Sequence, residues 1–374
     1  MPPGYWKFRL GGLLIAVSLL VACSGPVMPP SSPPMPAETQ TAPGLSVTDA
    51  AGREVTFPEP PQRIVAAGRA LFMVADALYF FPESSSRLVA LGKTGQSQLD
   101  FIPVVDPAYQ DKIILESETG PEQIAAARPD AVILKSINAE TLGKPLEVLG
   151  IPVVYVDLET PDQYARDLNT LGQLLKNEAR AAQVIDFYQQ RRQRVAETLD
   201  DLQQDQKPRV LLLYYTDRDG AVAFNVPPLA WMQTLMTEMA GGQPMWTDAQ
   251  LGQGWTRVSF EQIAAWDPDQ VYIIAYFNDV DEVVRGLEAD PQWQALRAVQ
   301  EDRLYGFPAD YYSWDQPTPR WILGLTWLAS RIHPERFQDL DMAQEIRTFY
   351  REMYNLDEAA YQKYIQPKLT GDWR

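Results

Sequence analysis

One stretch of sequence, residues 122–130 (EQIAAARPD), returns as residues 261–269 (EQIAAWDPD) with seven of its nine positions identical. Each copy predicts a short helix with Ile and Ala on its packing face and a glutamate in its first turn, where the helix dipole favours negative charge. The Pro-Asp pair ends the helix and begins the turn into an apolar run, Ala131–Leu134 or Val271–Ile274. The repeat therefore predicts two α/β lobes of related design.

Short apolar runs separated by helical patterns continue outward from both copies. They are Arg63–Ala66, Leu88–Leu91 and Val153–Val156 in the first half, and Val210–Leu213 and Leu304–Phe307 in the second. Strands that alternate with helices are typical of parallel sheets with crossover helices. Ahead of these runs, Leu45–Phe57 alternates apolar and polar residues around the turn residues Asp49–Gly52, which predicts a hairpin.

Residues 162–202 have a different character, because their apolar residues follow helical spacing and no proline occurs after Pro161. A helix from about Glu178 to Leu202, capped by Asn177, would be about 37 Å long at 1.5 Å per residue. Such a helix is long enough to cross between two lobes. An ordinary surface helix in one large domain would leave the same pattern.

These patterns together predict an α/β fold of two Rossmann-like lobes with parallel sheets. The N-terminal lobe takes residues 45–160, and the C-terminal lobe with its tail takes residues 208–374. Linking helices are predicted in residues 161–207, among them the long helix that is able to cross between the lobes.

The first 23 residues are typical of a lipoprotein signal peptide. Lys7 and Arg9 precede an apolar run of about a dozen residues, too short for a bilayer span of roughly 20. The run ends in Leu20–Cys23, which resembles a bacterial lipobox with Cys23 as the lipidated residue; the alternative is a chance thiol after an ordinary signal peptide. Residues 24–44 are rich in Pro and Ser and predict a disordered tether. We expect an extracytoplasmic protein, lipid-anchored to the cell membrane.

Composition excludes several classes of function. The net charge of −17 argues against nucleic-acid binding, which needs a positive field. His333 is the sole histidine, so a zinc or manganese site built on several histidines is excluded. It is also the sole candidate base for serine or cysteine hydrolase chemistry. We find no Walker loop or dinucleotide fingerprint, and we predict no catalytic residue, resident metal or cofactor.

The region from about Leu45 to Tyr354 is similar to the cobalamin- and iron-siderophore-binding family of ABC importer components. The resemblance is carried by Val47–Arg53 with Arg63–Val65, by both repeat copies, and by Asp290–Trp293 with Arg303–Tyr305. It implies a monomeric binding protein, not an enzyme, with two α/β lobes joined by a single long rigid helix. The ligand of such a protein lies in the cleft between the two lobes. It also implies an ABC permease and ATPase complex as the partner.

Two glutamates match the positions with which this family docks onto basic residues of the permease. They are Glu122 and Glu261, one in each repeat copy. The resemblance therefore implies one docking carboxylate on each lobe. The alternative is an ordinary charge at a helix start, where glutamate is common.

Candidate ligand contacts lie where strands end, because loops at the carboxyl ends of strands carry binding residues in α/β folds. In the first lobe the candidates are Arg69, Lys93 and Thr94. The cations Arg69 and Lys93 are able to pair with an anionic chelate or oxyanion, and the alternative is that they are ordinary solvated surface charges. In the second lobe, where eight of the ten Trp residues lie between Trp231 and Trp327, they are Tyr215, Trp255, Arg257, Tyr276, Tyr312, Trp314 and Arg320. Trp321 and Trp327 have helical spacing and are predicted to be core.

The sequence thus predicts a binding protein that captures a small-molecule metal chelate of the iron-siderophore type. An aromatic cleft wall suits a bulky or planar chelate. Molybdate or tungstate, cobalamin and haem stay open as ligands within the same fold. A surface sensor or a carboxylate-based hydrolase is the alternative from another class.

Overall fold

The computed structural model describes residues 44–374 except 94, 96–98, 117, 219 and 250. The predicted signal peptide, Cys23, nearly all of the tether, and Thr94 lie outside the described residues. The described chain begins with the predicted hairpin, in which β1 (Leu45–Thr48) pairs antiparallel with β2 (Glu54–Phe57).

The first sheet is wholly parallel and has the strand order β5-β4-β3-β6-β7. Its strands are β3 (Ile64–Ala66), β4 (Leu88–Gly92), β5 (Ile113–Leu115), β6 (Ala131–Lys135) and β7 (Val153–Val156). Its helices are α1 (Phe72–Leu78), α2 (Glu83–Arg87), α3 (Ile102–Val105), α4 (Pro121–Ala126) and α5 (Lys144–Val148). Strands β6 and β7 are buried throughout, as expected for a parallel sheet covered on both faces. We call the part built on this sheet lobe 1.

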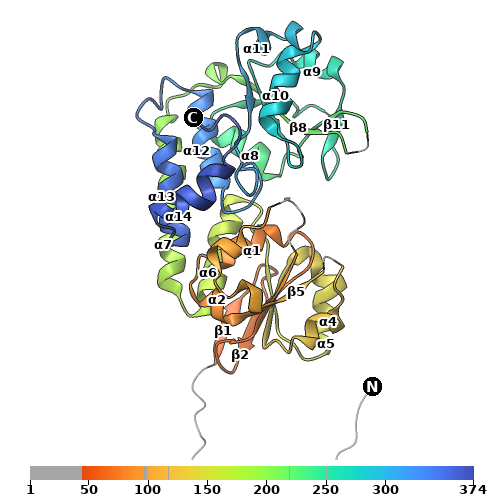
Figure 1. The fold of residues 1–374 in the computed structure, drawn as a ribbon, viewed down its shortest axis with the longest axis vertical. Helices are drawn as coiled ribbons and strands as arrows, with labels where there is room; N and C mark the ends of the chain where they lie inside the picture. Colours follow the sequence, from red (N-terminus) through yellow and green to blue (C-terminus); the bar gives the residue numbers. More distant parts are fainter. Residues whose placement is uncertain (1–43, 94, 96–98, 117, 219, 250) are drawn as a thin grey trace, which may run out of the picture. The chain divides into compact units, whose positions relative to one another are not determined.

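Two helices follow lobe 1, α6 (Pro161–Leu175) and α7 (Glu178–Thr198). Asn177 caps α7, because its side chain accepts a hydrogen bond from the Arg180 backbone N–H at 3.1 Å. The predicted start of this helix is therefore confirmed, and its end falls a few residues earlier than predicted. Its 21 residues span about 32 Å. Figure 1 shows α7 beside two helices from the C-terminal part of the chain, α12 and α13. Helix α7 packs against α12, which in turn packs against α13.

The second sheet has the order β11-β9-β8-β12-β13, with β10 also paired to β8. Its strands are β8 (Arg209–Thr216), β9 (Ala223–Val226), β10 (Gln243–Pro244), β11 (Thr256–Val258), β12 (Gln270–Ile274) and β13 (Leu304–Gly306). Parallel pairing was predicted, and it holds for β8, β12 and β13, but the sheet is mixed because β9 runs antiparallel to both β8 and β11. The reason is local: β8 folds straight back into β9 through a turn in which Gly220 takes φ +74°. We call the part built on this sheet lobe 2.

Lobe 2 and the tail contribute the remaining α-helices. They are α8 (Met232–Met239), α9 (Phe260–Trp266), α10 (Val280–Ala289), α11 (Arg297–Gln300), α12 (Trp321–Ile332), α13 (Met342–Tyr354) and α14 (Glu358–Ala360). Trp321 and Trp327 on α12 are completely buried, so the prediction that they belong to the core is confirmed. Short 3₁₀ and π turns fill several connections, for example Trp293–Ala295 before α11.

The sequence repeat is also a structural repeat. In lobe 1, Asp130 accepts hydrogen bonds from the backbone N–H of Arg63, and Arg63 reaches back to the carbonyls that end α4. In lobe 2, Asp269 accepts from the backbone N–H of Arg209, whose side chain reaches the Trp266 carbonyl that ends α9. The same Arg–Asp staple therefore fixes the amino end of the central strand, β3 or β8, to the end of the repeat helix.

Candidate ligand-binding site

The order of strands in lobe 1 places a topological switch point at β3, because β4 and β6 lie on its two sides. Ligands of open α/β sheets bind at the carboxyl ends of strands at such a point. The turn that follows β3 has two left-handed residues, Gly68 at φ +93° and Ala70 at φ +58°. Arg69 lies between them. Its exposed guanidinium has no side-chain partner among the described residues.

Asn138, which sequence reasoning missed, holds this turn in place. Its side-chain oxygen accepts a hydrogen bond from the Arg69 backbone N–H at 2.9 Å, and its amide donates to the Arg69 carbonyl at 3.3 Å. Asn138 follows β6, so both residues come from strands that meet at the switch point. Nothing in the local sequence distinguishes this buried asparagine from an ordinary loop residue, and only the sheet order identifies it.

The other two cationic groups near these strand ends are already paired. Lys93 follows β4 and is exposed, with its Nζ 2.7 Å from the equally exposed Glu116 carboxylate. Lys135 ends β6 and is only 2% exposed, with its Nζ 2.7 Å from Glu159. Burial lowers the pKa of Lys135, and Glu159 opposes that shift. Arg69 therefore stands out in lobe 1 as the cation at a strand end that keeps its charge available.

Lobe 2 presents a group of four aromatic rings near the carboxyl ends of β8 and β12, and we call them the aromatic wall. Tyr214 lies two residues before the end of β8, and Tyr276 follows β12; their ring centroids are 4.6 Å apart. The other two rings are Trp255, just before β11, and Trp231, just before α8. Trp255 lies 5.1 Å from Tyr214, and Trp231 lies 5.6 Å from Trp255. All four side chains are partly exposed. The wall therefore presents ring faces and edges on which a ligand could pack. Two of the predicted ligand contacts, Trp255 and Tyr276, belong to it.

A buried carboxylate supports the wall from behind. Asp315 accepts a hydrogen bond from the Tyr276 hydroxyl at 2.6 Å and from the Gln233 amide at 2.9 Å. Burial raises the pKa of Asp315 above its ordinary value, while the hydrogen bonds that it accepts lower it. Burial also raises the pKa of the Tyr276 hydroxyl, so this ring stays neutral and oriented.

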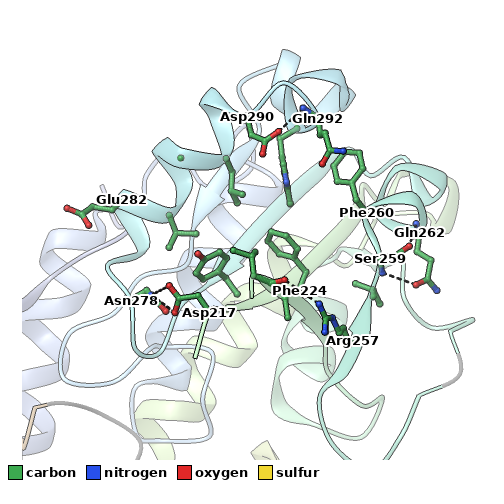
Figure 2. A pocket seen from close by; sticks show the side chains of 18 of the residues that line it. Asp217, Phe224, Arg257, Ser259, Phe260, Gln262, Asn278, Glu282, Asp290 and Gln292 are labelled. Carbon is green, nitrogen blue, oxygen red and sulfur yellow. Dashed lines mark hydrogen bonds between the residues drawn. The ribbon is translucent and has the colours of Figure 1, made fainter. Parts of the chain in front are cut away.

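Tyr215 and Arg257 were predicted beside Trp255 and Tyr276, but the structure places them elsewhere. Successive side chains of a strand point to opposite faces, so Tyr214 takes the wall position and Tyr215 takes the other face. There Tyr215 and Arg257 line a separate groove on lobe 2 with Phe224 (Figure 2). Which of the two adjacent tyrosines joins the wall depends on the phase of β8, which the sequence prediction did not resolve.

Tyr312, Trp314 and Arg320 belong to a loop that is buried throughout. Tyr312 lines the cavity between the lobes that is described below, whereas Trp314 and Arg320 contact other groups of the protein and are not presented to a ligand in this structure. The Arg320 guanidinium is 0% exposed and pairs with Asp76 of α1 and with Asp310. Two carboxylates already neutralise this guanidinium, so it has no charge to offer an anionic ligand. It joins lobe 2 to α1 of lobe 1 instead.

Further contacts surround this buried ion cluster. Tyr312 stacks on Phe72 of α1 with ring centroids 6.0 Å apart, and the Trp314 Nε1–H donates to Asp310 at 3.0 Å. Burial raises the pKa of Asp76 to about 6, against the lowering effect of Arg320. The cluster therefore holds the two lobes together through α1.

A cavity of about 290 Å³ lies between elements of the two lobes. Leu99, which comes after β4, lines one side, and residues 275–279 after β12 line another together with Asp310 and Tyr312. Tyr276 belongs to both the cavity and the aromatic wall. The carboxyl ends of both sheets therefore contribute to one hollow.

The sequence model described as "Periplasmic binding protein" matches residues 82–311, more than half of the chain. The chain belongs to the periplasmic binding protein family. Its members are substrate-binding proteins of ABC transporters and not enzymes, so the hydrolase alternative is dropped. They act outside the cytoplasm and deliver small-molecule ligands to a permease and ATPase complex.

Similar proteins bind different ligands. The molybdate-binding protein MolA of Haemophilus influenzae is 25% identical over 344 residues, covering 84% of this chain and 93% of that protein. The iron-uptake system-binding protein of Bacillus subtilis is 23% identical over 191 residues, 49% of this chain and 56% of that protein. A crystal structure of a periplasmic solute-binding protein from Veillonella parvula has TM-score 0.69 at 22% identity, covering 86% of this chain and 96% of that one.

The two glutamates predicted to dock lie in equivalent places in this periplasmic binding protein. Glu122 and Glu261 are exposed in the first turns of α4 and α9, and no ion-pair partner for either occurs in the described part of the chain. Hydrogen bonds from the Glu261 backbone and from Ser259 hold the pKa of Glu261 below its ordinary value. Each helix start is fixed by a capping glutamine, Gln123 or Gln262.

The described residues also bear on membrane spanning and on metal binding. None of the helices in the described part of the chain has the length and hydropathy needed to cross a bilayer. Within the same residues, no three His, Cys, Asp or Glu side chains gather in an arrangement suited to a metal ion.

Proposed function

We propose that this binding protein captures a metal chelate of the iron-siderophore type on the aromatic wall and delivers it to its ABC permease. The proposal rests on the group of four partly exposed rings, in which Trp231 and Trp255 pack beside Tyr214 of β8 and Tyr276 after β12. Rings of this kind bind bulky or planar organic surfaces through dispersion and stacking. Arg69, from the equivalent strand end of lobe 1, supplies the charge for an anionic group of the chelate.

Molybdate is the second candidate ligand. It is favoured by the similarity to MolA, which extends over 93% of that protein. A small oxyanion needs several hydrogen-bond donors in place of an apolar wall. Arg69 and the backbone of its left-handed turn are the donors that lobe 1 offers. Both ligands therefore use Arg69, and only the chelate also needs Trp255.

A binding panel decides between them. The purified full chain is melted with ferric hydroxamate, ferric catecholate, haem, cobalamin and molybdate, each in excess. A ligand at 100 times its dissociation constant should stabilise the protein by about 2.7 kcal/mol. We expect a ferric chelate to give the shift. A shift with molybdate alone would show the chelate assignment to be wrong.

Two variants test the site itself. Trp255→Leu should weaken binding of the ferric chelate by about tenfold, because one stacked ring is worth about 1.4 kcal/mol. Trp373→Leu is the matched control, since Trp373 is equally half-buried but lies near the C-terminus. If the two variants bound the ferric chelate with equal affinity, the aromatic wall would not be part of the binding site. If Arg69→Ala lost molybdate binding while Trp255→Leu bound molybdate normally, the ligand would be the oxyanion and not the chelate.

The membrane anchor and the docking glutamates complete the proposal. Cys23 is the site of lipidation, so Cys23→Ser should release the protein from the membrane fraction into the soluble extracytoplasmic fraction. Glu122 and Glu261 dock with the permease, so their double replacement by alanine should abolish uptake while ligand binding stays intact. Retention of Cys23→Ser in membranes, or loss of ligand binding in the double variant, would contradict the respective assignment.

A further inference from the structure

Six aspartates in the described part of the chain are buried, and five of them pair with a cation of the protein. The five pairs are Asp49 with Arg53, Asp106 with Lys112, Asp167 with Arg166, and both Asp76 and Asp310 with Arg320. Asp315 is the sixth: it is 0% exposed, and none of the ion pairs among the described residues includes it. We propose that Asp315 binds a monovalent cation, Na⁺ or K⁺, in a site directly behind the aromatic wall.

The hydrogen bonds to Asp315 favour the charged form of its carboxyl group. The Tyr276 hydroxyl and the Gln233 amide both donate to Oδ2, at 2.6 and 2.9 Å. A hydroxyl donor at 2.6 Å is typical of an ionised acceptor. A charged carboxylate in an apolar interior is costly unless an opposite charge lies beside it. Because the described residues supply no such charge, a bound cation is the group that balances the carboxylate.

Oxygen atoms without hydrogen-bond partners lie at and beside this carboxylate. Asp315 Oδ1 is buried and makes no hydrogen bond within the described residues, and the same is true of Gln233 Oε1 and Ser313 Oγ. Gln233 contacts Asp315 directly, and Ser313 is close enough to lower the pKa of Asp315, although its hydroxyl makes no hydrogen bond of normal geometry. Two further oxygens of this kind, on Gln316 and Thr318, follow within three residues of the sequence. Unpartnered buried oxygens are rare and costly, whereas hard cations are bound by oxygens of these types.

The charge of the donors selects a monovalent ion. Asp315 is the carboxylate among them, and the amide and hydroxyl oxygens are neutral, so one positive charge balances the site. Divalent ions are usually bound by more than one carboxylate. In the part of the chain that the structure describes, no three acidic, His or Cys side chains form such a group.

The cation site is connected to the aromatic wall through Tyr276. Its hydroxyl binds the same carboxylate, and its ring lies 4.6 Å from that of Tyr214. A cation that fixes Asp315 therefore also fixes this ring. Since the wall binds the ligand in the function proposed above, linkage requires cation and ligand to change the affinity of each other by the same factor. This coupling rests on the proposed function, whereas the cation site itself does not.

Thermal unfolding of the ligand-free full chain tests the cation site. NaCl, KCl or CaCl₂ replaces N-methylglucamine chloride at constant ionic strength, so that general screening is unchanged. We expect Na⁺ or K⁺ at ten times its dissociation constant to raise the melting temperature by about 3 °C, with saturation at higher concentration. A melting temperature that depends on none of these ions overturns the proposal and leaves Asp315 as a protonated acid. A response to Ca²⁺ alone overturns the choice of a monovalent ion.

Two variants locate the response in the protein. Asp315→Asn should abolish it, whereas Asp106→Asn, which replaces a buried carboxylate that has Lys112 beside it, should retain it. Ser313→Ala removes one neutral oxygen and should raise the dissociation constant of the cation by about tenfold, which keeps the test decisive if Asp315→Asn does not fold. Ser136→Ala is its control, because the Ser136 hydroxyl is also buried and unpartnered but follows β6 in lobe 1. A wild-type response in Asp315→Asn, or equal responses of the two serine variants, overturns the assigned site.

Ligand affinity provides the last test. The ligand found by the binding panel should bind about tenfold more weakly in N-methylglucamine chloride than in the stabilising salt, because Tyr276 is then less firmly held. Asp315→Asn should bind it equally in both salts. Equal affinity of the wild type in both salts overturns the coupling. A panel in which nothing binds overturns the proposed function and leaves the melting experiment to decide the cation site.

Discussion

The two lobes agree at the amino ends of their central strands and differ at the carboxyl ends. At the amino ends, Arg63 with Asp130 and Arg209 with Asp269 form the same staple. At the carboxyl ends, lobe 1 has a polar turn around Arg69 and lobe 2 has the aromatic wall. The staple has the same structural role in both lobes, whereas in the proposed function each carboxyl end contacts a different part of the ligand.

Removing Arg320 from the buried ion cluster that joins the lobes should give the largest loss of stability. Arg320→Met leaves Asp76 and Asp310 buried without their counter-charge, which should cost about 3–5 kcal/mol of unfolding free energy. Arg285→Met is the control, because Arg285 is exposed on α10. The measurement is urea unfolding followed by circular dichroism. A loss equal to that of the control would mean that the cluster does not hold the lobes together.

The same cluster predicts a pH dependence. Burial raises the pKa of Asp76 to about 6 in the folded protein, from an unfolded value near 3.8. The folded state therefore binds more protons between these values, and the stability contributed by Asp76 rises as pH falls from about 6 to about 4. The slope approaches about 1.4 kcal/mol per pH unit.

Asp76→Asn should remove that slope, because the amide does not titrate. Unfolding free energies of wild type and variant are compared at several pH values in this window, so that groups common to both cancel. A difference between the two proteins that stays constant with pH would show that Asp76 remains ionised in the folded state.

The shared staple makes a prediction of equality. Asp130→Ala and Asp269→Ala should each cost about 1–2 kcal/mol, because each leaves backbone N–H groups at the start of a central strand without their acceptor. The depressed pKa of Asp269, held by the Arg209 backbone and by Arg297 against burial, agrees with a carboxylate that works in its charged form. Thermal unfolding of the two variants measures the costs. A large inequality would break the comparison between the lobes.

Sequence reasoning reached the fold because its signals are local and repeated. The repeat, the Asn177 cap and the apolar strands each depend on neighbours in the chain, and all three appear as predicted. The second sheet departed from expectation because the β8–β9 hairpin depends on one glycine turn, and the periodicity of a short strand does not reveal its direction.

The site was harder to predict because it depends on strand phase and on distant partners. A shift of one residue on β8 exchanged Tyr215 for Tyr214. Arg320 was predicted as a ligand contact because it is a cation in a segment rich in aromatic residues. Its charge is in fact neutralised by Asp76, which is far away in the sequence. Asn138 was missed because its role exists only where β3 and β6 lie side by side.

The smallest effect on stability should come from Asn138, and it separates folding from binding. Asn138→Ala removes the two hydrogen bonds that its buried side chain makes to the Arg69 backbone. Because Arg69 itself is exposed, water can reach the freed backbone groups, so we expect a loss of about 1 kcal/mol. Asn169→Ala, which removes one exposed amide contact on α6, is the control. The left-handed residues Gly68 and Ala70 should then relax, because the Arg69 backbone between them loses both of these hydrogen bonds. Ligand affinity should therefore fall more than stability does, as measured by titration calorimetry. A variant with unchanged affinity would show that lobe 1 does not need a fixed turn to hold its part of the ligand.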